Sequence, residues 1–314
     1  MKRILFYSSV NSLELFKTQK FYQIDISILK DLGYDVLLSN RIFDSLLFWK
    51  YDILFSYFYR YSFFAALLAK CFGKKTYFTG GIDSLDSDYA SAFNYKIQAL
   101  FFKLCYWVAD SCIIVSQSDL KNIFKVSSLK KKLSYSEHVI NTKLFIADVP
   151  KEKIFTSIVW MGDEGNVVRK GVDKALQIFA ELKKIPEFVD YRFVIIGRKG
   201  EGEVLVRSII DKYNLKGSVE LKGEVSEEDK INLLKQSKYY FQLSLYEGFG
   251  LAALEALCAN NIIIHSGKGG LANPIYKEQL LFDIDNDFDS ELLKLVNKLA
   301  CFTPITSYDN LLEY

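Results

Sequence analysis

Residues 244–256 read Ser-Leu-Tyr-Glu-Gly-Phe-Gly-Leu-Ala-Ala-Leu-Glu-Ala and follow directly on the apolar run Tyr239–Leu243. That run has the length of a buried strand, and the residues from Gly250 to Ala259 have helical periodicity. The sequence therefore predicts a strand, a glycine-containing loop and a helix. Such a unit is typical of open α/β folds, in which ligands bind beyond the carboxyl ends of the strands.

The same stretch contains the residue types that hold a phosphorylated sugar. Gly248 and Gly250 let a ligand approach the backbone, and the free amides at the start of a helix can hold a phosphate. Glu247 precedes the helix and Glu255 lies about two turns into it, a spacing that predicts both carboxylates on one side. Carboxylates accept strong, charge-assisted hydrogen bonds from sugar hydroxyls.

Strand-length apolar runs alternate with helical patterns along the whole chain, which predicts an α/β fold. The expected strands are Arg3–Val10, Asp35–Leu38, Asp52–Phe58, Lys75–Phe78, Ser111–Val115, Ile154–Met161, Arg192–Ile196, Val219–Leu221, Tyr239–Leu243 and Ile262–His265. The expected helices include Phe16–Leu32, Tyr61–Phe72, Tyr95–Ala109, Gly171–Lys184, Gly202–Tyr213, Glu227–Gln236, Gly250–Ala259 and Ser290–Leu299.

Two domains are expected, because 314 residues exceed one ordinary core. The segment His138–Lys151 interrupts the alternation and predicts a linker. We therefore expect two Rossmann-like domains, residues 1–150 and 151–314, that face each other across a cleft. The last helix could pack back on the first domain.

Composition narrows the setting. The five cysteines are odd in number and never form a Cys-x-x-Cys pair, which predicts buried free thiols in a reducing cytoplasm. With only two histidines a zinc site is not expected. No stretch has the length of a membrane span. Residues 1–150 hold 19 Lys and Arg against 13 Asp and Glu, and residues 151–314 hold 21 against 25, so the halves carry +6 and −4.

The segment around Glu247 and Glu255 resembles the paired-glutamate motif of retaining family-4 glycosyltransferases of the GT-B fold (glycosyl transferases group 1). Its neighbours agree with that family in consistent order from about residue 154 to 275. The matching segments are Trp160-Met161-Gly162, Arg169-Lys170-Gly171-Val172-Asp173, Phe193–Gly197, Val219–Ser226 and Gly267–Leu271. Over residues 1–150 the resemblance rests on Ala109-Asp110 through Ser116 and on the Gly80-Gly81 turn.

The resemblance implies a nucleotide-sugar donor site without a divalent metal or other cofactor. Lys170 would neutralise the donor diphosphate, Glu255 would bind the ribose, and Glu247 would hold hydroxyls of the transferred sugar. Backbone groups would contact the phosphates, with Gly162, Gly248, Phe249, Gly250 and Leu251 lining the site. The leaving phosphate would help to deprotonate the acceptor hydroxyl.

The chain also departs from the family pattern. Asp163 stands where an Arg is common, and Arg169 is the expected substitute. Neither histidine matches the family's catalytic position, and Asp83 after the Gly80-Gly81 turn is the candidate replacement. Two alternatives therefore stay open: a non-catalytic relative that binds sugar nucleotides, and a GT-B-fold sugar-nucleotide epimerase.

The expected reaction is transfer from a UDP- or GDP-sugar to a saccharide or lipid-linked saccharide in bacterial surface polysaccharide or lipopolysaccharide synthesis. The basic first domain and an aromatic run from Phe55 to Phe64, near Lys70, Lys74 and Lys75, favour peripheral contact with the inner face of the membrane. Scattered basic residues without a recognised module do not favour nucleic acid.

Overall fold

The computed structural model describes residues 1–128, 130–146 and 149–302, and of Cys301 the backbone alone. The chain divides into two compact units, Met1–Val139 and Ile140–Tyr314. The boundary thus precedes the division after Pro150 that the sequence predicts. Each unit is an α/β domain built on a six-stranded parallel sheet.

The first unit has the strand order β2-β1-β3-β4-β5-β6. Its strands are β1 (Arg3–Ser8), β2 (Asp35–Ser39), β3 (Ile53–Tyr57), β4 (Lys75–Thr79), β5 (Ser111–Ile114) and β6 (Leu133–Tyr135). Its helices are α1 (Leu15–Thr18), α2 (Lys20–Asp31), α3 (Ser62–Cys71), α4 (Ala92–Val108) and α5 (Gln117–Val126). The central strands are nearly all apolar, as a parallel sheet covered on both faces requires.

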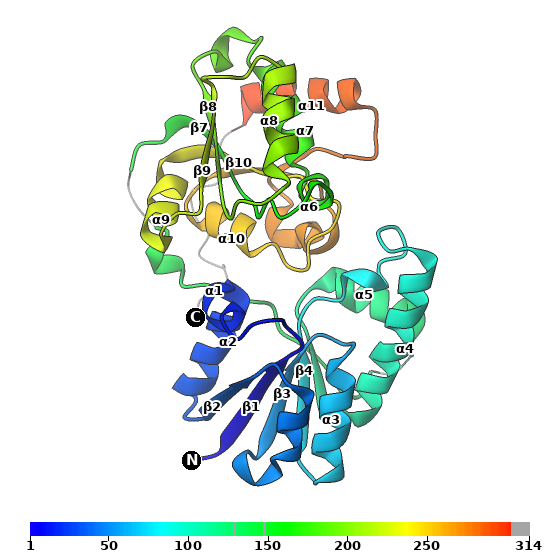
Figure 1. The fold of residues 1–314 in the computed structure, drawn as a ribbon. Helices are drawn as coiled ribbons and strands as arrows, with labels where there is room; N and C mark the ends of the chain where they lie inside the picture. Colours follow the sequence, from blue (N-terminus) through cyan, green and yellow to red (C-terminus); the bar gives the residue numbers. More distant parts are fainter. Residues whose placement is uncertain (129, 147–148, 303–314) are drawn as a thin grey trace. The chain divides into compact units, whose positions relative to one another are not determined.

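Helices cover the two faces of this sheet unequally (Figure 1). Leu5, Leu54 and Phe78 point to the face that α3, α4 and α5 cover. Ile4, Phe6 and Phe55 point to the other face, where α1 and α2 pack. Successive residues of β1 therefore serve opposite cores, because side chains alternate along a strand.

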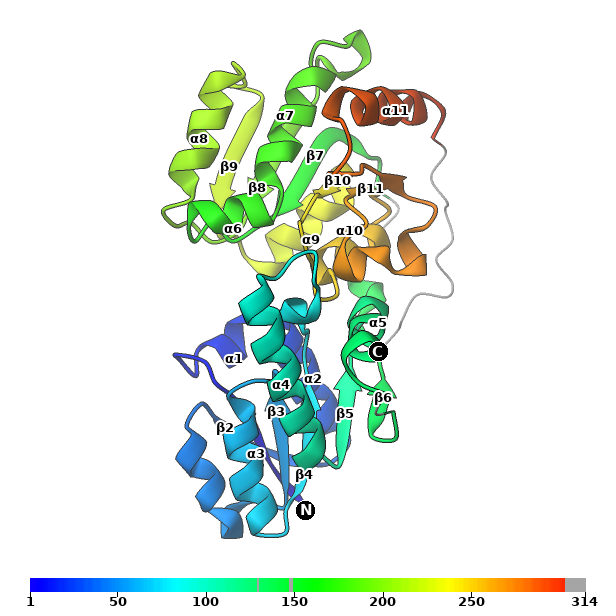
Figure 2. The same ribbon diagram turned by 90° about the vertical axis from the view of Figure 1, so that its right-hand side faces the viewer.

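The second unit repeats the pattern with the order β12-β11-β10-β7-β8-β9 (Figure 2). Its strands are β7 (Glu152–Ile158), β8 (Arg192–Ile196), β9 (Val219–Gly223), β10 (Ser237–Gln242), β11 (Ile262–His265) and β12 (Leu280–Leu281). Its helices are α6 (Glu164–Arg169), α7 (Val172–Leu182), α8 (Glu203–Lys212), α9 (Glu227–Gln236), α10 (Leu251–Cys258) and α11 (Phe288–Cys301). The largest core of this unit packs α7, α8 and α11 on one face of the sheet.

Two expectations need correction. The expected helix Phe16–Leu32 is two helices, because Gln19 is extended (φ −89°, ψ 120°) and separates α1 from α2. Of the cysteines, Cys105, Cys112 and Cys258 are buried and free, whereas Cys71 at the end of α3 is free but exposed. The side chain of Cys301 lies outside the described residues. The apolar side of α11 packs on the second unit's own core through Leu295 and Leu299.

Candidate active site

The second unit gathers four polar side chains where β10 ends. Oε1 of Glu247 accepts hydrogen bonds from Gln242 Nε2 (2.7 Å) and Ser244 Oγ (2.9 Å), and it lies 2.5 Å from Lys170 Nζ. The Glu247 side chain is only 11% exposed, so this ion pair is largely shielded from water. Charge-assisted hydrogen bonds of this kind fix a carboxylate in one orientation.

The backbone around Lys170 is tied to the loop that carries Glu247. Lys170 follows α6, and the next residue, Gly171, is left-handed (φ 67°) and begins α7. A Cβ at position 171 would overlap the carbonyl oxygen of Leu243. The Leu245 amide also donates to the Arg169 carbonyl (2.8 Å). Lys170 and Glu247 therefore meet because two loops pack backbone against backbone, which needs glycine at 171.

A glycine turn holds the Glu247 loop from another side. The Gly270 amide donates to the Glu247 carbonyl (2.6 Å), and a Cβ at Gly269 would overlap that oxygen. This turn is the segment Gly267–Leu271 on which part of the family resemblance rests. The structure thus gives its glycines a packing role beside Glu247.

Helix α10 begins just beyond, at a left-handed Gly250 (φ 88°). Gly250 offers no side chain to cap the first turn, and Phe249 before it is buried. Its eight residues include Leu251, at which the helix begins. Backbone amides at such a helix start favour an anion. Gly248, Phe249, Gly250 and Leu251 thus lie together next to Glu247, as the sequence predicts; their contact with a donor stays a prediction.

Glu255 lies inside α10 and is held by a lysine that the sequence pattern did not reveal. Its Oε2 is 2.7 Å from Lys230 Nζ on α9, and its side chain is 4% exposed. Lys230 also pairs with Glu227 (3.1 Å) and lies over the Phe145 ring (5.9 Å). Lys230 stands 25 positions from Glu255 in sequence, so no local pattern connects the two.

Tyr240 in β10 lies near both glutamates. Burial, and after it the negative charges of Glu247 and Glu255, raise the pKa of Tyr240 well above its usual value. Its hydroxyl is 3.1 Å from Gln242 Oε1, which orients the amide that donates to Glu247. Gln242 was also missed, although a polar residue in the otherwise apolar run Tyr239–Leu243 was a usable signal.

Asp163 and Arg169 have local partners. Asp163 Oδ1 accepts from the Asn166 amide (2.6 Å) and caps α6, while Arg169 donates to Asn166 Oδ1 (2.6 Å). The aspartate that replaces the family's usual arginine therefore acts as a helix cap. The carbonyl of Gly162 accepts from the Glu201 amide (3.1 Å). These contacts place Gly162 and Arg169 on the loops that flank α6.

The other predicted catalytic residue, Asp83, belongs to the first unit. It is exposed and its Oδ1 accepts from the Ser84 amide (2.8 Å), an arrangement typical of a turn. Its role as a catalytic substitute stays a prediction. The two histidines are buried, which lowers the pKa of both His138 and His265 to about 4 and keeps them neutral at pH 7.

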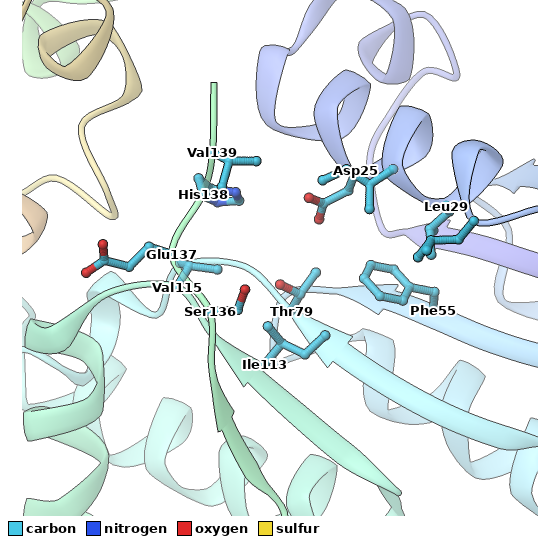
Figure 3. Close-up of a pocket in the computed structure, with 12 residues that line it drawn as sticks. Asp25, Leu29, Phe55, Thr79, Ile113, Val115, Ser136, Glu137, His138 and Val139 are labelled. Atoms are coloured by element: carbon cyan, nitrogen blue, oxygen red, sulfur yellow. The ribbon is translucent and has the colours of Figure 1, made fainter. Parts of the chain in front are cut away.

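The first unit contains a cavity of about 280 Å³ between α2 and the ends of β3–β6 (Figure 3). Leu29, Phe55 and Ile113 form apolar walls, and Asp25 and His138 add polar groups. Tyr57 donates a short hydrogen bond to Asp25 Oδ2. Burial raises the pKa of Asp25 to about 6, against the smaller opposing effect of this hydrogen bond.

Metal ligands and membrane spans are both absent from the described residues. No three His, Cys, Asp or Glu side chains within them come together as ligands of one metal ion. No helix in the described part of the chain is long and apolar enough to cross a membrane.

Comparison with known proteins bears on the second unit in particular. Residues 165–299 match the family model of glycosyl transferases group 1. The GDP-mannose:cellobiosyl-diphosphopolyprenol alpha-mannosyltransferase of Xanthomonas oryzae is 32% identical over 163 residues, which is 45% of this chain and 40% of that protein. The matching polypeptide of human phosphatidylinositol N-acetylglucosaminyltransferase is 30% identical over 105 residues, 33% of this chain and 21% of that protein. The chain thus covers less than half the length of these two relatives.

Solved structures extend the likeness in fold to both units. Anabaena HepE in complex with UDP and glucose superposes with a TM-score of 0.65 and 12% identity, covering 87% of this chain and 82% of that one. Sucrose-phosphate synthase from Thermosynechococcus elongatus gives a TM-score of 0.69 at 16% identity, covering 96% and 90%. Residues 165–299 therefore belong to the glycosyl transferases group 1 family, in a chain that has the GT-B fold.

Proposed function

We propose that the chain transfers a glycosyl group, with retention, from a UDP- or GDP-sugar to a saccharide or lipid-linked saccharide acceptor. The observation that carries the proposal is the shielded pair of Lys170 and Glu247 at the end of β10, beside the start of α10. A cation, a carboxylate and free helix amides are the groups that a diphosphate sugar needs. Relatives named as sugar transferases and neighbours solved with UDP support the same class of donor.

In this proposal Lys170 leaves Glu247 for the donor diphosphate, and Glu247 then accepts hydrogen bonds from hydroxyls of the sugar. Arg169 adds positive charge, and the amides at Gly250 and Leu251 hold phosphate oxygens. Glu255 accepts from the ribose, oriented by Lys230. The bond from the sugar C1 to the phosphate oxygen breaks, a bond from C1 to the acceptor oxygen forms, and the acceptor proton passes to the leaving phosphate. No divalent metal takes part.

We assign the acceptor to the first unit. Its net positive charge and the cavity of Figure 3, with Asp25 and His138 among apolar walls, support an amphiphilic or anionic acceptor. Peripheral contact with the inner face of the membrane, and a place in surface polysaccharide synthesis, belong to the same proposal.

Donor binding is tested first, by thermal stabilisation with UDP- and GDP-sugars. A ligand at about 100 times its dissociation constant adds roughly 2.7 kcal/mol of stability. We expect one nucleotide family to stabilise the wild type and Lys170→Met to lose the effect. Lys184→Met, which removes a lysine that is 70% exposed on the same unit, is the matched control. Absence of stabilisation by every nucleotide sugar would refute the proposal.

Product analysis separates the alternatives. A donor incubated without acceptor and converted to its epimer would identify an epimerase. Binding without turnover, with a range of saccharide acceptors, would identify a non-catalytic relative; the capping role of Asp163 in place of arginine is the observation that favours this candidate.

A further inference from the structure

One face of α4 exposes apolar side chains and lysines in alternation. Phe93, Leu100 and Trp107 are 72%, 57% and 69% exposed, and Lys96 and Lys103 lie exposed between them. Steps of three and four residues put all five on one line along the helix. We call Phe93, Lys96, Leu100, Lys103 and Trp107 the α4 stripe.

Helix α3 widens this apolar surface. It lies beside α4 in the first unit (Figures 1 and 2), and its exposed Phe64 contacts Phe101 of α4, with ring centroids 6.2 Å apart. Tyr61, also exposed, lies 6.4 Å from the same ring. Among the described residues, Trp160 is the one exposed aromatic side chain of the second unit, and all the others are in the first. The aromatic surface is therefore a property of this unit.

The charge of the same surface is positive. Neither α3 nor α4 contains Asp or Glu, and together they carry Lys70, Lys96 and Lys103. Lys132 adds a cation at the end of α4, where its Nζ donates to the carbonyls of Tyr106 (3.1 Å) and Trp107 (3.0 Å). The neighbouring carboxylate, Asp110, is paired with Lys70 (2.9 Å).

We propose that the face formed by α3 and α4 docks on an anionic lipid surface, with the α4 stripe in the headgroup region. Aromatic residues favour the boundary between headgroups and acyl chains, and lysines reach lipid phosphates from the same helix face. A second copy of the chain fits less well, since a two-fold interface through α4 would bring its lysines against one another without any carboxylate on either helix. The inference deepens the proposed function by naming the surface through which a lipid-linked acceptor is approached.

Trp107 reports directly on this contact. In a Trp49→Phe/Trp160→Phe background it is the remaining tryptophan of the chain. With vesicles of equal parts phosphatidylcholine and phosphatidylglycerol, we expect its emission to shift to shorter wavelength and brominated acyl chains to quench it. Phosphatidylcholine alone should give little of either effect. Vesicle binding with an unchanged Trp107 spectrum would overturn the proposal, because the protein would then dock through another surface.

Paired substitutions test the two parts of the stripe. Lys96→Gln/Lys103→Gln should weaken vesicle partitioning by about five-fold per lysine, roughly 25-fold in all. Lys212→Gln/Lys216→Gln removes the same charge from the second unit and should leave partitioning nearly unchanged. Leu100→Ser should also weaken binding, whereas Leu293→Ser, at a similarly exposed position of α11, should not. Equal effects of stripe and control variants would overturn the assignment.

Sedimentation velocity without lipid completes the test. A dimer that Leu100→Ser dissociates, together with no vesicle binding, would show that the stripe serves a second copy instead. Because the vesicle assay uses neither donor nor acceptor, its failure would leave the proposed glycosyl transfer standing, and thermal stabilisation by nucleotide sugars tests that function separately.

Discussion

A single carboxylate oxygen, Oε1 of Glu247, has three partners in Lys170, Gln242 and Ser244. A buried charge is costly unless hydrogen bonds and an opposite charge compensate it. Each of the three donors therefore depends on the one acceptor, and none is easily replaced by water. A sugar hydroxyl that enters the site meets a carboxylate already oriented, which is how a site lowers the entropy cost of reaction.

Glu247→Gln tests this arrangement with little change of shape. We expect the transfer rate, kcat, to fall by about 10²- to 10³-fold, the range seen when one preorganised electrostatic group is lost. Glu224→Gln, at an exposed position of the same unit, should keep the wild-type rate. Steady-state kinetics with the identified donor provide the measurement, and an unchanged kcat in Glu247→Gln would remove Glu247 from the mechanism.

Asp25 makes stability depend on pH. Its folded pKa of about 6 exceeds the ordinary value of 3.8, so folding favours the protonated acid. This contribution is complete below about pH 4 and is lost as pH rises through 6. Two pKa units correspond to roughly 3 kcal/mol. We expect Asp25→Asn, which can still accept from Tyr57, to gain stability relative to wild type between pH 4 and 7, by up to about that amount.

Urea denaturation at several pH values measures this gain. Asp31→Asn, at the exposed end of the same helix α2, is the control and should show no comparable trend. The groups that contact or face Asp25 across the cavity are Tyr57, Glu137 and His138. A constant difference between wild type and Asp25→Asn across this range would contradict the raised pKa.

At the scale of elements, the junction of α6, α7 and β10 depends on a glycine. Position 171 is left-handed and packed against the Leu243 carbonyl, so Gly171→Ala suffers both backbone strain and an overlap. Gly217 has φ 84° but open space around its Cβ position. We expect Gly217→Ala to cost about 1 kcal/mol, and Gly171→Ala about 2 to 4 kcal/mol, of unfolding free energy.

The difference between these two alanine variants isolates the contact from the strain. Urea denaturation of both gives it directly. Donor affinity should fall in Gly171→Ala alone, since that substitution moves Lys170 relative to Glu247. Equal losses of stability in the two variants would mean that the loops are not held together at Leu243.

The elements that the sequence predicted well are those with an uninterrupted apolar pattern. The runs in β1, β8 and β11 are buried throughout or nearly so, and their pattern requires no tertiary information. The break at Gln19 was missed because no glycine or proline marks it. The pair of Lys230 and Glu255 was missed because it joins two helices that only the folded sheet brings together.

As a whole the molecule is two units, each with its own sheet and core. Chains of this kind need not unfold in one step. The second unit holds the proposed donor groups, and the first holds Asp25 and the aromatic surface of α3 and α4. Changes in the two units should therefore be separable in one experiment.

Calorimetry of the full chain tests that separation. We expect a bound nucleotide sugar to raise the melting temperature of one transition, and Asp25→Asn at pH 7 to raise that of the other. Leu293→Ser, at an exposed position of α11, serves as a control that shifts neither by much. If donor and Asp25→Asn moved the same single transition, the two units would unfold as one.

The position of the unit boundary decides where the chain could be divided. Ile140 and Phe145 are both buried, and the Phe145 ring lies beneath Lys230, the partner of Glu255. A shortened protein that began at Lys151 would lack both side chains and uncover the lysine behind the proposed ribose site. One that began at Ile140 would keep them, so a difference of eleven residues separates an intact donor half from one that is damaged at its core.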